Sequence, residues 1–256
     1  MSERLRKLTR GLYAIHDLPA AFIPRYSAIL VADIHLGFEE EMASKGIFLP
    51  RMQVKRAAEV IQRCLELTSA RRLIIVGDLK HLFERLGRRE AKDVREFLER
   101  VVPMFRSVVL IRGNHDTFVY IRLREFGVDV VDELLIDDML IVHGHRRPSI
   151  DGGYSILVMG HEHPSIAIRD PLGTVAKLPC FLVVPLSNGA TAVVLPALGM
   201  YQSGTSVSTS PEAYLSPILR SLAILEEAKP YAIVEGEGAY ELPKLGLIEG
   251  FLQATL

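Results

Sequence analysis

Apolar and polar residues follow one another along this chain in short blocks that predict strands leading into polar loops. Five apolar runs, rich in Val, Ile and Leu, span residues 28–32, 73–76, 108–111, 139–142 and 156–159, and each ends in a polar cluster. Apolar runs of this length bounded by turn residues are typical of buried strands. With residues 11–15 and 27–32 as the first two strands, the pattern predicts a sheet whose strand ends carry polar loops.

Two segments between these runs have helical periodicity. Between Gln53 and Leu67, and again over roughly Glu90 to Val101, apolar residues recur at spacings of three and four. This spacing puts the apolar side chains on one face of an amphipathic helix. Alternation of strand and helix through residue 111 predicts right-handed crossovers onto a largely parallel sheet.

After Gly160 the pattern changes to closely spaced strands, which predict a second, mixed or antiparallel sheet packed on the first. These strands are expected at about 165–169, 174–177, 180–186 and 190–196, with turns at residues 170–173 and 187–189. The Asn188-Gly189 pair between apolar runs is a hairpin signal. Residues 199–212 predict a long loop, 212–227 a helix and 230–235 a strand, so we expect 199–256 to close the core of a single domain spanning 1–256.

Composition and charge narrow the class of protein. The chain has 256 residues, of which 49% are hydrophobic, and its formal net charge is -1. A core of substantial size is therefore possible, whereas long-range attraction to nucleic acid or an anionic membrane is not expected. Cys64 and Cys180 predict buried free thiols in a reducing compartment. Without a secretory signal or a membrane-spanning apolar run, we expect a cytoplasmic protein.

Side chains that could bind metal gather at the ends of the five runs. Seven of the eight histidines lie in or next to these polar clusters, leaving only His16 elsewhere. In open α/β sheets, ligands bind in the crevice beyond the carboxyl ends of the strands. We therefore expect one crevice to receive seven candidate ligands, which are Asp33, His35, Asp78, Asn114, His143, His161 and His163.

The ligand types predict a hard or borderline divalent ion. Carboxylate, amide oxygen and neutral imidazole suit Mn, Fe or Zn, and no cysteine lies nearby to form a thiolate site. Seven ligands are too many for one tetrahedral ion but suit two ions that share a bridging carboxylate. In extended backbone, residues two apart face the same side, so Asp33 with His35, and His161 with His163, are expected to aim into one cavity. Glycines 77, 113, 144 and 160 allow sharp turns beside these ligands.

The ordered motifs resemble those of the calcineurin-like metallophosphoesterase superfamily. They are Asp-x-His at 33–35, Gly-Asp at 77–78, Gly-Asn-His-Asp at 113–116, His-Gly-His at 143–145 and Gly-His-x-His at 160–163. The flanking residues are similar to a prokaryotic, largely archaeal subgroup of phosphoesterases, and the resemblance continues through Gly204-Thr205. It implies an α/β fold in which two packed mixed sheets are flanked by helices, as a four-layer α-β-β-α sandwich.

The resemblance also implies a role for each ligand. One ion would be held by Asp33, His35 and His163, the other by Asn114, His143 and His161, with Asp78 as the bridge. Two divalent ions are implied, with Mn²⁺ expected and Fe, Zn and Ni as alternatives. Phosphoester bonds would be hydrolysed by in-line attack of a metal-bridging hydroxide.

Other side chains near the motifs have less certain roles. By resemblance, His115 would act near the leaving oxygen as general acid or electrostatic stabiliser, with Asp116 as its orienting partner. For Arg112 and Arg146, contact with a substrate phosphate and a solvated face are equally open, whereas Arg85 to Arg89 are expected to be solvated.

Three further groups are not expected to bind metal. The sequence predicts that Glu39 to Glu41 form a solvated acidic segment. His16 and His81 are expected to be satisfied core or surface residues, although the family often has Asp or Asn at the position of His81. His145 stays undecided, because His143 fits the expected ligand better.

Within the enzyme class, a phosphodiesterase acting on nucleotide or nucleic-acid substrates is the first hypothesis. A phosphomonoesterase or a cyclic-nucleotide hydrolase is an alternative, and a non-catalytic metal-binding scaffold of the same fold is the hypothesis from another class. The presence of all seven ligands together with His115 favours an enzyme. The sequence carries no signal for oligomeric state.

Overall fold

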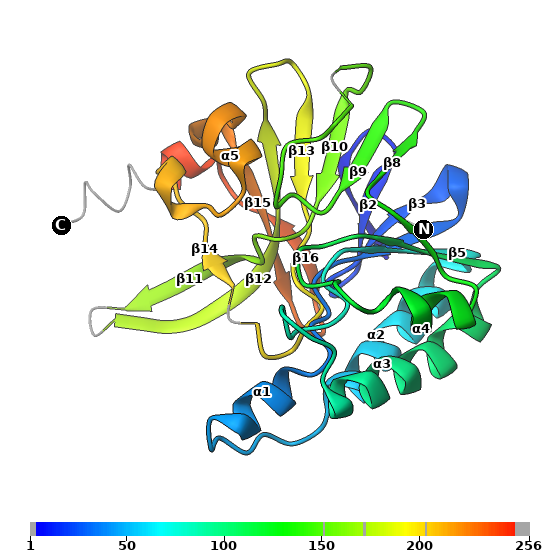
Figure 1. Cartoon of the computed structure of the whole chain (residues 1–256). Coiled ribbons are helices and arrows are strands. Elements are labelled where there is room, and N and C mark those ends of the chain that lie inside the picture. The colour runs from blue at the N-terminus through cyan, green and yellow to red at the C-terminus, as the bar shows by residue number, and fades with distance from the viewer. Residues whose placement is uncertain (1–3, 151, 171–172, 203, 249–256) are drawn as a thin grey trace.

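The computed structural model describes residues 4–150, 152–170, 173–202 and 204–248, and two β-sheets form its centre (Figure 1). The first sheet has seven strands in the order β1 to β7. They are β1 (Leu5–Thr9), β2 (Leu12–Ile15), β3 (Ala21–Ile23), β4 (Ala28–Val31), β5 (Arg72–Val76), β6 (Ser107–Ile111) and β7 (Asp129–Val131). Strands β1 to β4 pair antiparallel, whereas β4 to β7 are parallel, so the sheet is mixed.

The second sheet has nine strands and is also mixed. Its main path runs β14-β11-β12-β13-β10-β9-β8, and β15 joins β12 and β16 beside this path. The bounds are β8 (Glu133–Ile136), β9 (Met139–Val142), β10 (Ile156–Met159), β11 (Pro164–Asp170), β12 (Gly173–Pro185), β13 (Thr191–Val194), β14 (Thr205–Ser206), β15 (Lys229–Val234) and β16 (Gly238–Glu241). Strand β10 lies parallel to both β9 and β13, which gives this sheet a parallel centre.

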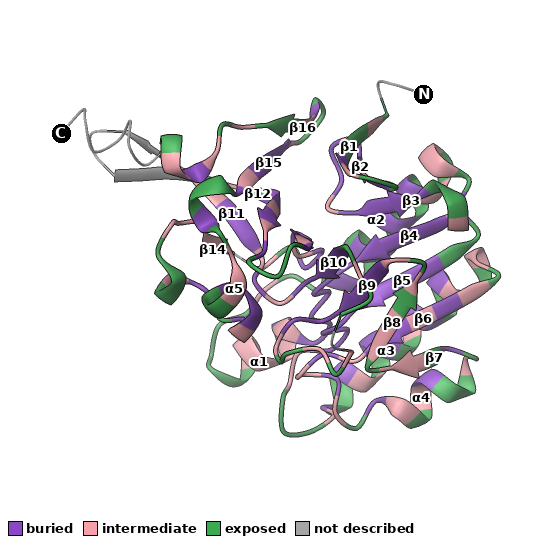
Figure 2. Cartoon of the chain, turned by 90° about the horizontal axis from the view of Figure 1, so that it is seen from above, coloured by how far each residue is buried: buried purple, intermediate pink, exposed green. Residues whose placement is uncertain are grey.

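Helices flank the two sheets (Figures 1 and 2). They are α1 (Phe38–Ser44), α2 (Gln53–Thr68), α3 (Arg88–Val101), α4 (Tyr120–Glu125) and α5 (Pro217–Leu222). Short 3₁₀ turns are η1 (Pro24–Tyr26), η2 (Val102–Met104), η3 (Pro211–Ala213) and η4 (Leu225–Glu227). Burial in Figure 2 is greatest in the strands, while the helices expose their outer sides.

Three apolar clusters hold these layers together. The first lies between α2, α3 and the first sheet and contains Ile61 and Phe97. The second lies between the two sheets and includes Leu30, whose neighbours Ile29 and Val31 belong to the first cluster. The third packs α5 against the outer face of the second sheet. Because β4 buries side chains on both faces, its apolar run is continuous rather than alternating. The result is the two-sheet α/β sandwich that the motifs predicted.

Several expected elements differ from those observed. Residues 11–15 and 27–32 were expected to be the first two strands, but β1 precedes them and β3 lies between them. The strands expected at 174–177 and 180–186 form one strand, β12, which pairs with β11 up to Pro179 and with β15 from Cys180. Pro179 lacks an N–H group, and the change of partner at this point lets it remain inside a strand.

The C-terminal part also differs in detail. A continuous helix over 212–227 is wrong, because the segment contains η3, α5 and η4 instead. Ser216 begins α5 by accepting a hydrogen bond from the backbone N–H of Ile218, and Pro217 occupies the first helical turn. The expected loop at 199–212 contains β14, which pairs with β11. Residues 171–172 of the expected turn and residues 249–256 lie outside the described residues.

Within residues 4–248, apart from the gaps given above, no helix has the length and apolar character needed to cross a bilayer.

Candidate metal centre

Five loops meet where the two sheets face each other. They follow β4, β5, β6, β9 and β10, as the sequence pattern predicted. The loops after β4 and β5 are joined by backbone hydrogen bonds, since Asp33 N donates to Gly77 O at 3.1 Å and His35 N to Asp78 O at 2.9 Å. The two sheets are joined at the same place, because His161 N donates to Asp33 Oδ2 at 2.9 Å. Residues far apart in the sequence therefore form one site.

The side chains converge by a different backbone geometry from the one expected. Asp33 and His35 have φ of 55° and 52°, and His161 and His163 have φ of 72° and 47°, so both pairs are in the left-handed region rather than extended. Asp78 is left-handed as well, with φ of 51°. This conformation is uncommon for residues with a Cβ and tends to occur at functional sites, where the surrounding structure enforces it.

One group of candidate ligands combines both sheets. The ligand atoms of Asp33, His35 and His163 all lie within 4.8 Å of one another. His35 Nε2 is 3.3 Å from His163 Nε2, and His163 Nε2 is 3.5 Å from Asp33 Oδ1. Because two imidazole nitrogens and a carboxylate oxygen point to one position, this group could hold a divalent ion.

A second group lies beside the first. Asp78, His143 and His161 also bring their ligand atoms within 4.8 Å of one another. His143 Nε2 is 3.2 Å from Asn114 Oδ1 and 3.3 Å from Asp78 Oδ2. The other ring nitrogen, Nδ1, lies 3.1 Å from the carbonyl oxygen of Val76, to which it donates. That hydrogen bond leaves Nε2 free as a ligand atom.

Asp78 lies between the two groups. Its Oδ2 atom is 3.3 Å from His143 Nε2 and 3.8 Å from His35 Nε2. Its Oδ1 atom accepts a hydrogen bond from the backbone N–H of His115 at 3.0 Å. The carboxylate therefore faces a ligand of each group with one oxygen while the other is held by the backbone.

The residues present fit bound metal. Asp33 Oδ1 is buried and has no hydrogen-bond partner among the residues that the structure describes, which is costly for a carboxylate unless a cation binds there. Burial lowers the pKa of His35 to about 3, so its ring is neutral and offers a lone pair. Burial opposes ionisation of Asp33 and Asp78, but the adjacent rings of His163 and His143 lower the pKa of both carboxyl groups. Burial opposes protonation of His143 and His163, but the adjacent carboxylates raise the pKa of both rings, to about 9 for His143. Metal binds the neutral imidazole, so an ion at this site would displace those protons.

Two glycines allow the close approach of these loops. A Cβ atom on Gly113 would lie 2.1 Å from Asp78 Oδ1, and one on Gly77 would lie 2.1 Å from His143 Nδ1. Both distances are far below van der Waals contact, so any side chain at either position must displace a candidate ligand.

We expect Gly113→Ala to weaken metal binding by about tenfold or more, because the added methyl group displaces the Asp78 carboxylate. Overpacking of this kind also destabilises a folded protein by about 1–3 kcal/mol. Metal affinity can be measured by titration against a chromogenic chelator, with thermal unfolding recorded in parallel. Gly127→Ala is the control for loss of stability alone: its φ of 69° makes alanine strained, but a Cβ there meets no atom within 4 Å, so metal affinity should not change. Unchanged affinity in Gly113→Ala would contradict the expectation.

His115 and Asp116 both lie at the site, but Asp116 does not orient His115 as expected. The Asp116 carboxylate is fully buried and accepts backbone hydrogen bonds from Gly113 at 2.9 Å, and from Asp78 and Leu79 at 2.8 Å each. Nδ1 of His115 instead faces the carbonyl oxygen of His81. Lys80 N also donates to this carboxylate, at 3.4 Å, so four N–H groups converge on its oxygens. Three of the four belong to the loop after β5, which Asp116 therefore holds in place.

The two candidate substrate arginines share one acidic partner. Arg112 forms an ion pair with Asp132 Oδ1, and Arg146 pairs with Asp132 Oδ2 at 3.2 Å. Arg112 also donates to the hydroxyl oxygen of Tyr120 at 3.2 Å. Both arginines follow strands that lead to the site, but each is partly neutralised by Asp132.

Two residues at the site, Glu41 and His81, were not among the residues predicted to belong to it. His81 Nδ1 lies 3.2 Å from His35 Nδ1, and His81 Nε2 contacts Glu41 Oε2. The expectation that Glu39 to Glu41 form a solvated segment is wrong, because they lie in α1, where Glu39 is buried and accepts a hydrogen bond from Gln53 N at 3.0 Å. The position of His81, three residues after Asp78, was a usable signal. No sequence signal connects Glu41 with the site.

The remaining two histidines differ in their surroundings. The ring of His145 lies 5.3 Å from that of His143 and 6.2 Å from that of His161, and its buried Nδ1 has no partner among the described residues. His16 Nδ1 pairs with Asp17 Oδ1 at 2.7 Å. His145 therefore borders the second ligand group, whereas His16 has a partner of its own.

Comparison with known proteins gives the family. The protein-family model described as calcineurin-like phosphoesterase matches residues 27–165, which is just over half of the chain. The fold and the His and Asp groups thus belong to a metal-dependent phosphoesterase, a hydrolase acting on ester bonds. The chain belongs to the calcineurin-like phosphoesterase family, as its motifs predicted.

Solved structures with the same fold include the nuclease MPE from Pseudomonas putida. It is 22% identical, with a TM-score of 0.58, and the match covers 90% of this chain and 94% of that one. Yfce, a phosphoesterase from E. coli, is 21% identical over 67% of this chain and 79% of its own, with a TM-score of 0.39. No curated protein matches the sequence.

Proposed function

We propose that this protein is a two-metal phosphoesterase and that its preferred substrates are phosphodiesters of the nucleotide or nucleic-acid type. The observation that carries the proposal is the pair of ligand groups on either side of Asp78. A single carboxylate oxygen lies 3.3 Å from a ligand of one group and 3.8 Å from a ligand of the other. Two ions about 4 Å apart, bridged by such a carboxylate, are a common arrangement in phosphoester hydrolysis.

In this mechanism the ligand groups keep the assignment that the resemblance implies. Asp33, His35 and His163 would hold one ion, Asn114, His143 and His161 the other, and Asp78 would bridge them. When bound, the ions supply positive charge that activates a water nucleophile and neutralises the phosphoryl oxygens. Oxygen and imidazole ligands suit Mn²⁺, with Fe, Zn and Ni as alternatives.

His115 would move a proton in the reaction. Its Nδ1 atom faces the carbonyl oxygen of His81 and therefore carries a proton. Its Nε2 atom is directed to the site, 4.0 Å from Asp78 Oδ2. In the imidazolium form, which has protons on both ring nitrogens, His115 would deliver the Nε2 proton to the leaving oxygen and would itself become the neutral Nδ1–H imidazole, so it would act as general acid.

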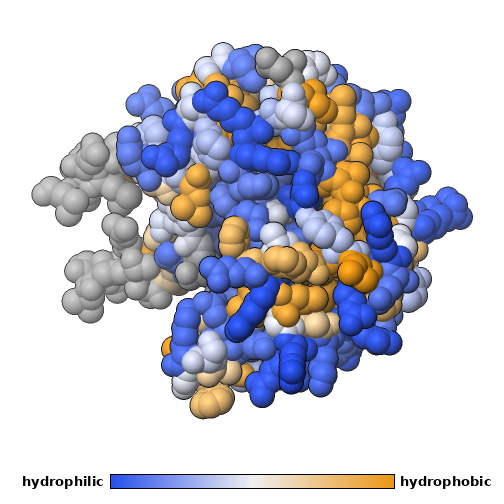
Figure 3. Space-filling model, viewed as in Figure 1, coloured by the Kyte–Doolittle hydropathy of each residue, from blue (hydrophilic) through white to orange (hydrophobic). Residues whose placement is uncertain are grey.

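Exposed aromatic side chains favour an ester with a planar ring. The Phe83 ring packs edge-on against His115 at 5.6 Å, yet Phe83 is 53% exposed. Thr117 joins the two loops by donating to Phe83 O at 2.6 Å, and the next residue, Phe118, is 62% exposed. Figure 3 shows that the face seen there is hydrophilic over much of its area, with apolar side chains exposed in patches. A nucleobase next to the leaving oxygen could stack on such rings.

A phosphomonoesterase is the second candidate, and the arginines favour it. Because Asp132 pairs with both Arg112 and Arg146, little free positive charge is left for the backbone of a longer polyanion. A formal net charge of -1 also provides no long-range attraction for nucleic acid. A small phosphomonoester would need only contacts with the metal site itself and no extended basic surface.

The test is a panel of mono- and diesters assayed with Mn, Ni, Mg and Zn, with Asp78→Ala as the blank. We expect metal-stimulated turnover, with nucleotide diesters preferred over monoesters. Preference for monoesters would select the second candidate. Purified protein that binds no transition metal and turns over neither class would overturn the proposal in favour of a non-catalytic scaffold.

We expect Arg146→Ala to raise KM by about three- to tenfold with little change in kcat. An arginine that binds a substrate phosphate contributes to ground state and transition state alike, so its loss weakens binding rather than chemistry. Steady-state kinetics on the best substrate of the panel measure both constants. Arg147→Ala is the control, as an exposed arginine next in sequence. An unchanged KM would remove Arg146 from the substrate site.

A further inference from the structure

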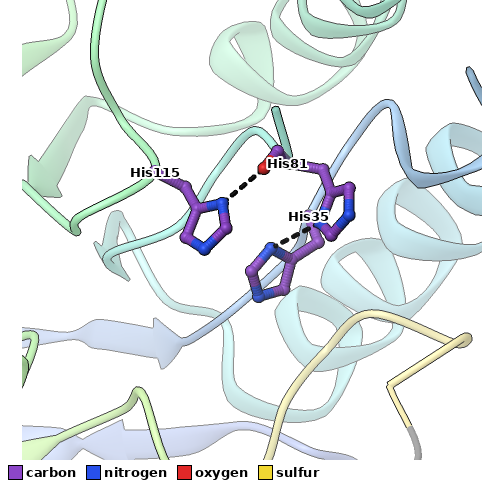
Figure 4. A group of neighbouring side chains, drawn as sticks. All are labelled: His35, His81 and His115. Carbon is purple, nitrogen blue, oxygen red and sulfur yellow. Dashed lines mark hydrogen bonds between the residues drawn. The ribbon is translucent and has the colours of Figure 1, made fainter. Parts of the chain in front are cut away.

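A row of three polar side chains leads from helix α1 to the candidate ligand His35. Glu41, in α1, contacts His81 Nε2 through its Oε2 atom. His81 Nδ1 lies 3.2 Å from His35 Nδ1, as the dashed line in Figure 4 shows. His35 Nε2, at the other side of that ring, faces Asp78 and His163. In both His81 and His35, one ring nitrogen therefore faces the preceding member of the row or site and the other nitrogen faces the following one.

The direction of the hydrogen bonds follows from the carboxylate at the end of the row. An ionised carboxylate only accepts, so the proton of His81 must be on Nε2. The neutral His81 ring then has a lone pair at Nδ1, and His35 must donate to it from its own Nδ1. A neutral His35 with its proton on Nδ1 carries a lone pair on Nε2, the nitrogen that faces the candidate metal site.

We propose that Glu41 and His81 are positioning residues, which fix His35 in the tautomer and orientation that bind metal. The proposal rests on the proposed function, in which His35 is a ligand. Metal-bound histidines usually donate their second N–H to a carboxylate, carbonyl or water, and this partner fixes the tautomer of the ring. For His35, the partner of the second N–H would be His81, which in turn contacts the Glu41 carboxylate.

His81 is itself held firmly, which a positioning residue requires. Its ring lies 4.9 Å from the ring of Phe38, which stacks on Tyr201 at 5.5 Å. Its backbone N–H lies 2.9 Å from both Leu36 O and Glu90 Oε1. Lys45 holds the other oxygen of Glu41 at 2.6 Å. Both residues that lead to His35 are thus held in place by contacts of their own.

His81 also reaches His115, so that one residue supports both a ligand and the candidate acid. The two rings are nearly parallel, at 16°, with centroids 5.7 Å apart. The carbonyl oxygen of His81 contacts His115 Nδ1, as Figure 4 shows. The three rings of His35, His81 and His115 also bring nitrogen atoms within 4.8 Å of one another, so a third ion among them is the competing explanation.

The experiment compares His81→Leu with His81→Asn. Leucine removes the acceptor that faces His35, whereas the Oδ1 atom of asparagine can occupy nearly the same position as Nδ1 and accept the same hydrogen bond. Glu41→Leu removes the carboxylate, and Glu41→Gln keeps an accepting oxygen. Glu99→Leu is the matched control, because Glu99 is an exposed helical glutamate paired with an arginine four residues away.

Two measurements are made on each variant. The ¹⁵N chemical shifts of His35 in metal-free protein report its tautomer, which a merely structural role of His81 would not change. Ion content and affinity are measured on metal-loaded protein. We expect His81→Leu and Glu41→Leu to give a mixture of His35 tautomers and about 10- to 100-fold weaker binding of one ion. His81→Asn, Glu41→Gln and Glu99→Leu are expected to remain close to the wild type.

Unchanged His35 shifts and unchanged affinity in His81→Leu would overturn the proposal. Three ions bound by the wild type and two by His81→Leu would also overturn it, because His81 would then be a ligand. A wild type that binds no divalent ion would overturn the proposed function instead, while the His35 shifts in the metal-free protein would still decide whether His81 fixes the tautomer.

Discussion

Asp78→Ala is expected to lose bound metal and activity together, with turnover reduced by about a thousandfold or more. Asp78 is 2% exposed and its carboxylate faces ligands of both groups, so its removal deletes the shared ligand and takes away a carboxylate that lies 3.3 Å from His143 Nε2. Bound metal contributes several kcal/mol to the stabilisation of a phosphoryl transition state, which corresponds to a factor of about 10³ or more.

The measurement is metal content per chain together with kcat/KM on the same preparation. Asp78→Asn keeps the side-chain shape, so it separates loss of the ligand charge from loss of packing. Asp138→Asn is the control, because Asp138 is partly exposed and pairs with Arg10 and Ser155 rather than with the candidate ligands. If Asp78→Ala retained its full complement of ions, the bridging role of Asp78 would be wrong.

The strand ends could be predicted from sequence because two simple patterns coincide there. Apolar runs such as 28–32 and 73–76 are long enough to be buried strands, and each is followed at once by a polar cluster. Parallel strands deliver their carboxyl ends to one edge, so the clusters after β4, β5 and β6 meet in the first sheet and those after β9 and β10 meet in the second. The packing of the two sheets then brings both sets to one site. Helices α2 and α3 were predicted for a related reason, as their apolar faces have a clear period.

The local geometry of the site could not be predicted in the same way. Asp33 and His35 converge in the left-handed conformation, which is set by backbone hydrogen bonds to Gly77 and Asp78 and not by a local preference. Asp116 was expected, by resemblance, to orient His115, but its partners are backbone N–H groups of Gly113 and of the loop after β5. Glu41 reaches the site only because α1 packs beside it. The backbone conformation of Asp33 and His35, the partners of Asp116 and the position of Glu41 all depend on tertiary contacts, which a local sequence pattern does not encode.

His115→Gln is expected to keep bound metal while kcat falls by about 10²- to 10⁴-fold, the usual contribution of a general acid. The effect should increase with the pKa of the leaving alcohol, because a good leaving group such as nitrophenolate needs little protonation whereas an alkoxide needs it fully. Turnover of aryl and alkyl esters of the same acid, with metal content measured alongside, tests both statements. Phe83→Leu is the comparison variant, since it removes the ring that packs on His115 while leaving the imidazole in place. Retained turnover of alkyl esters would refute the role of His115 as acid, and loss of an ion would indicate that it is a ligand.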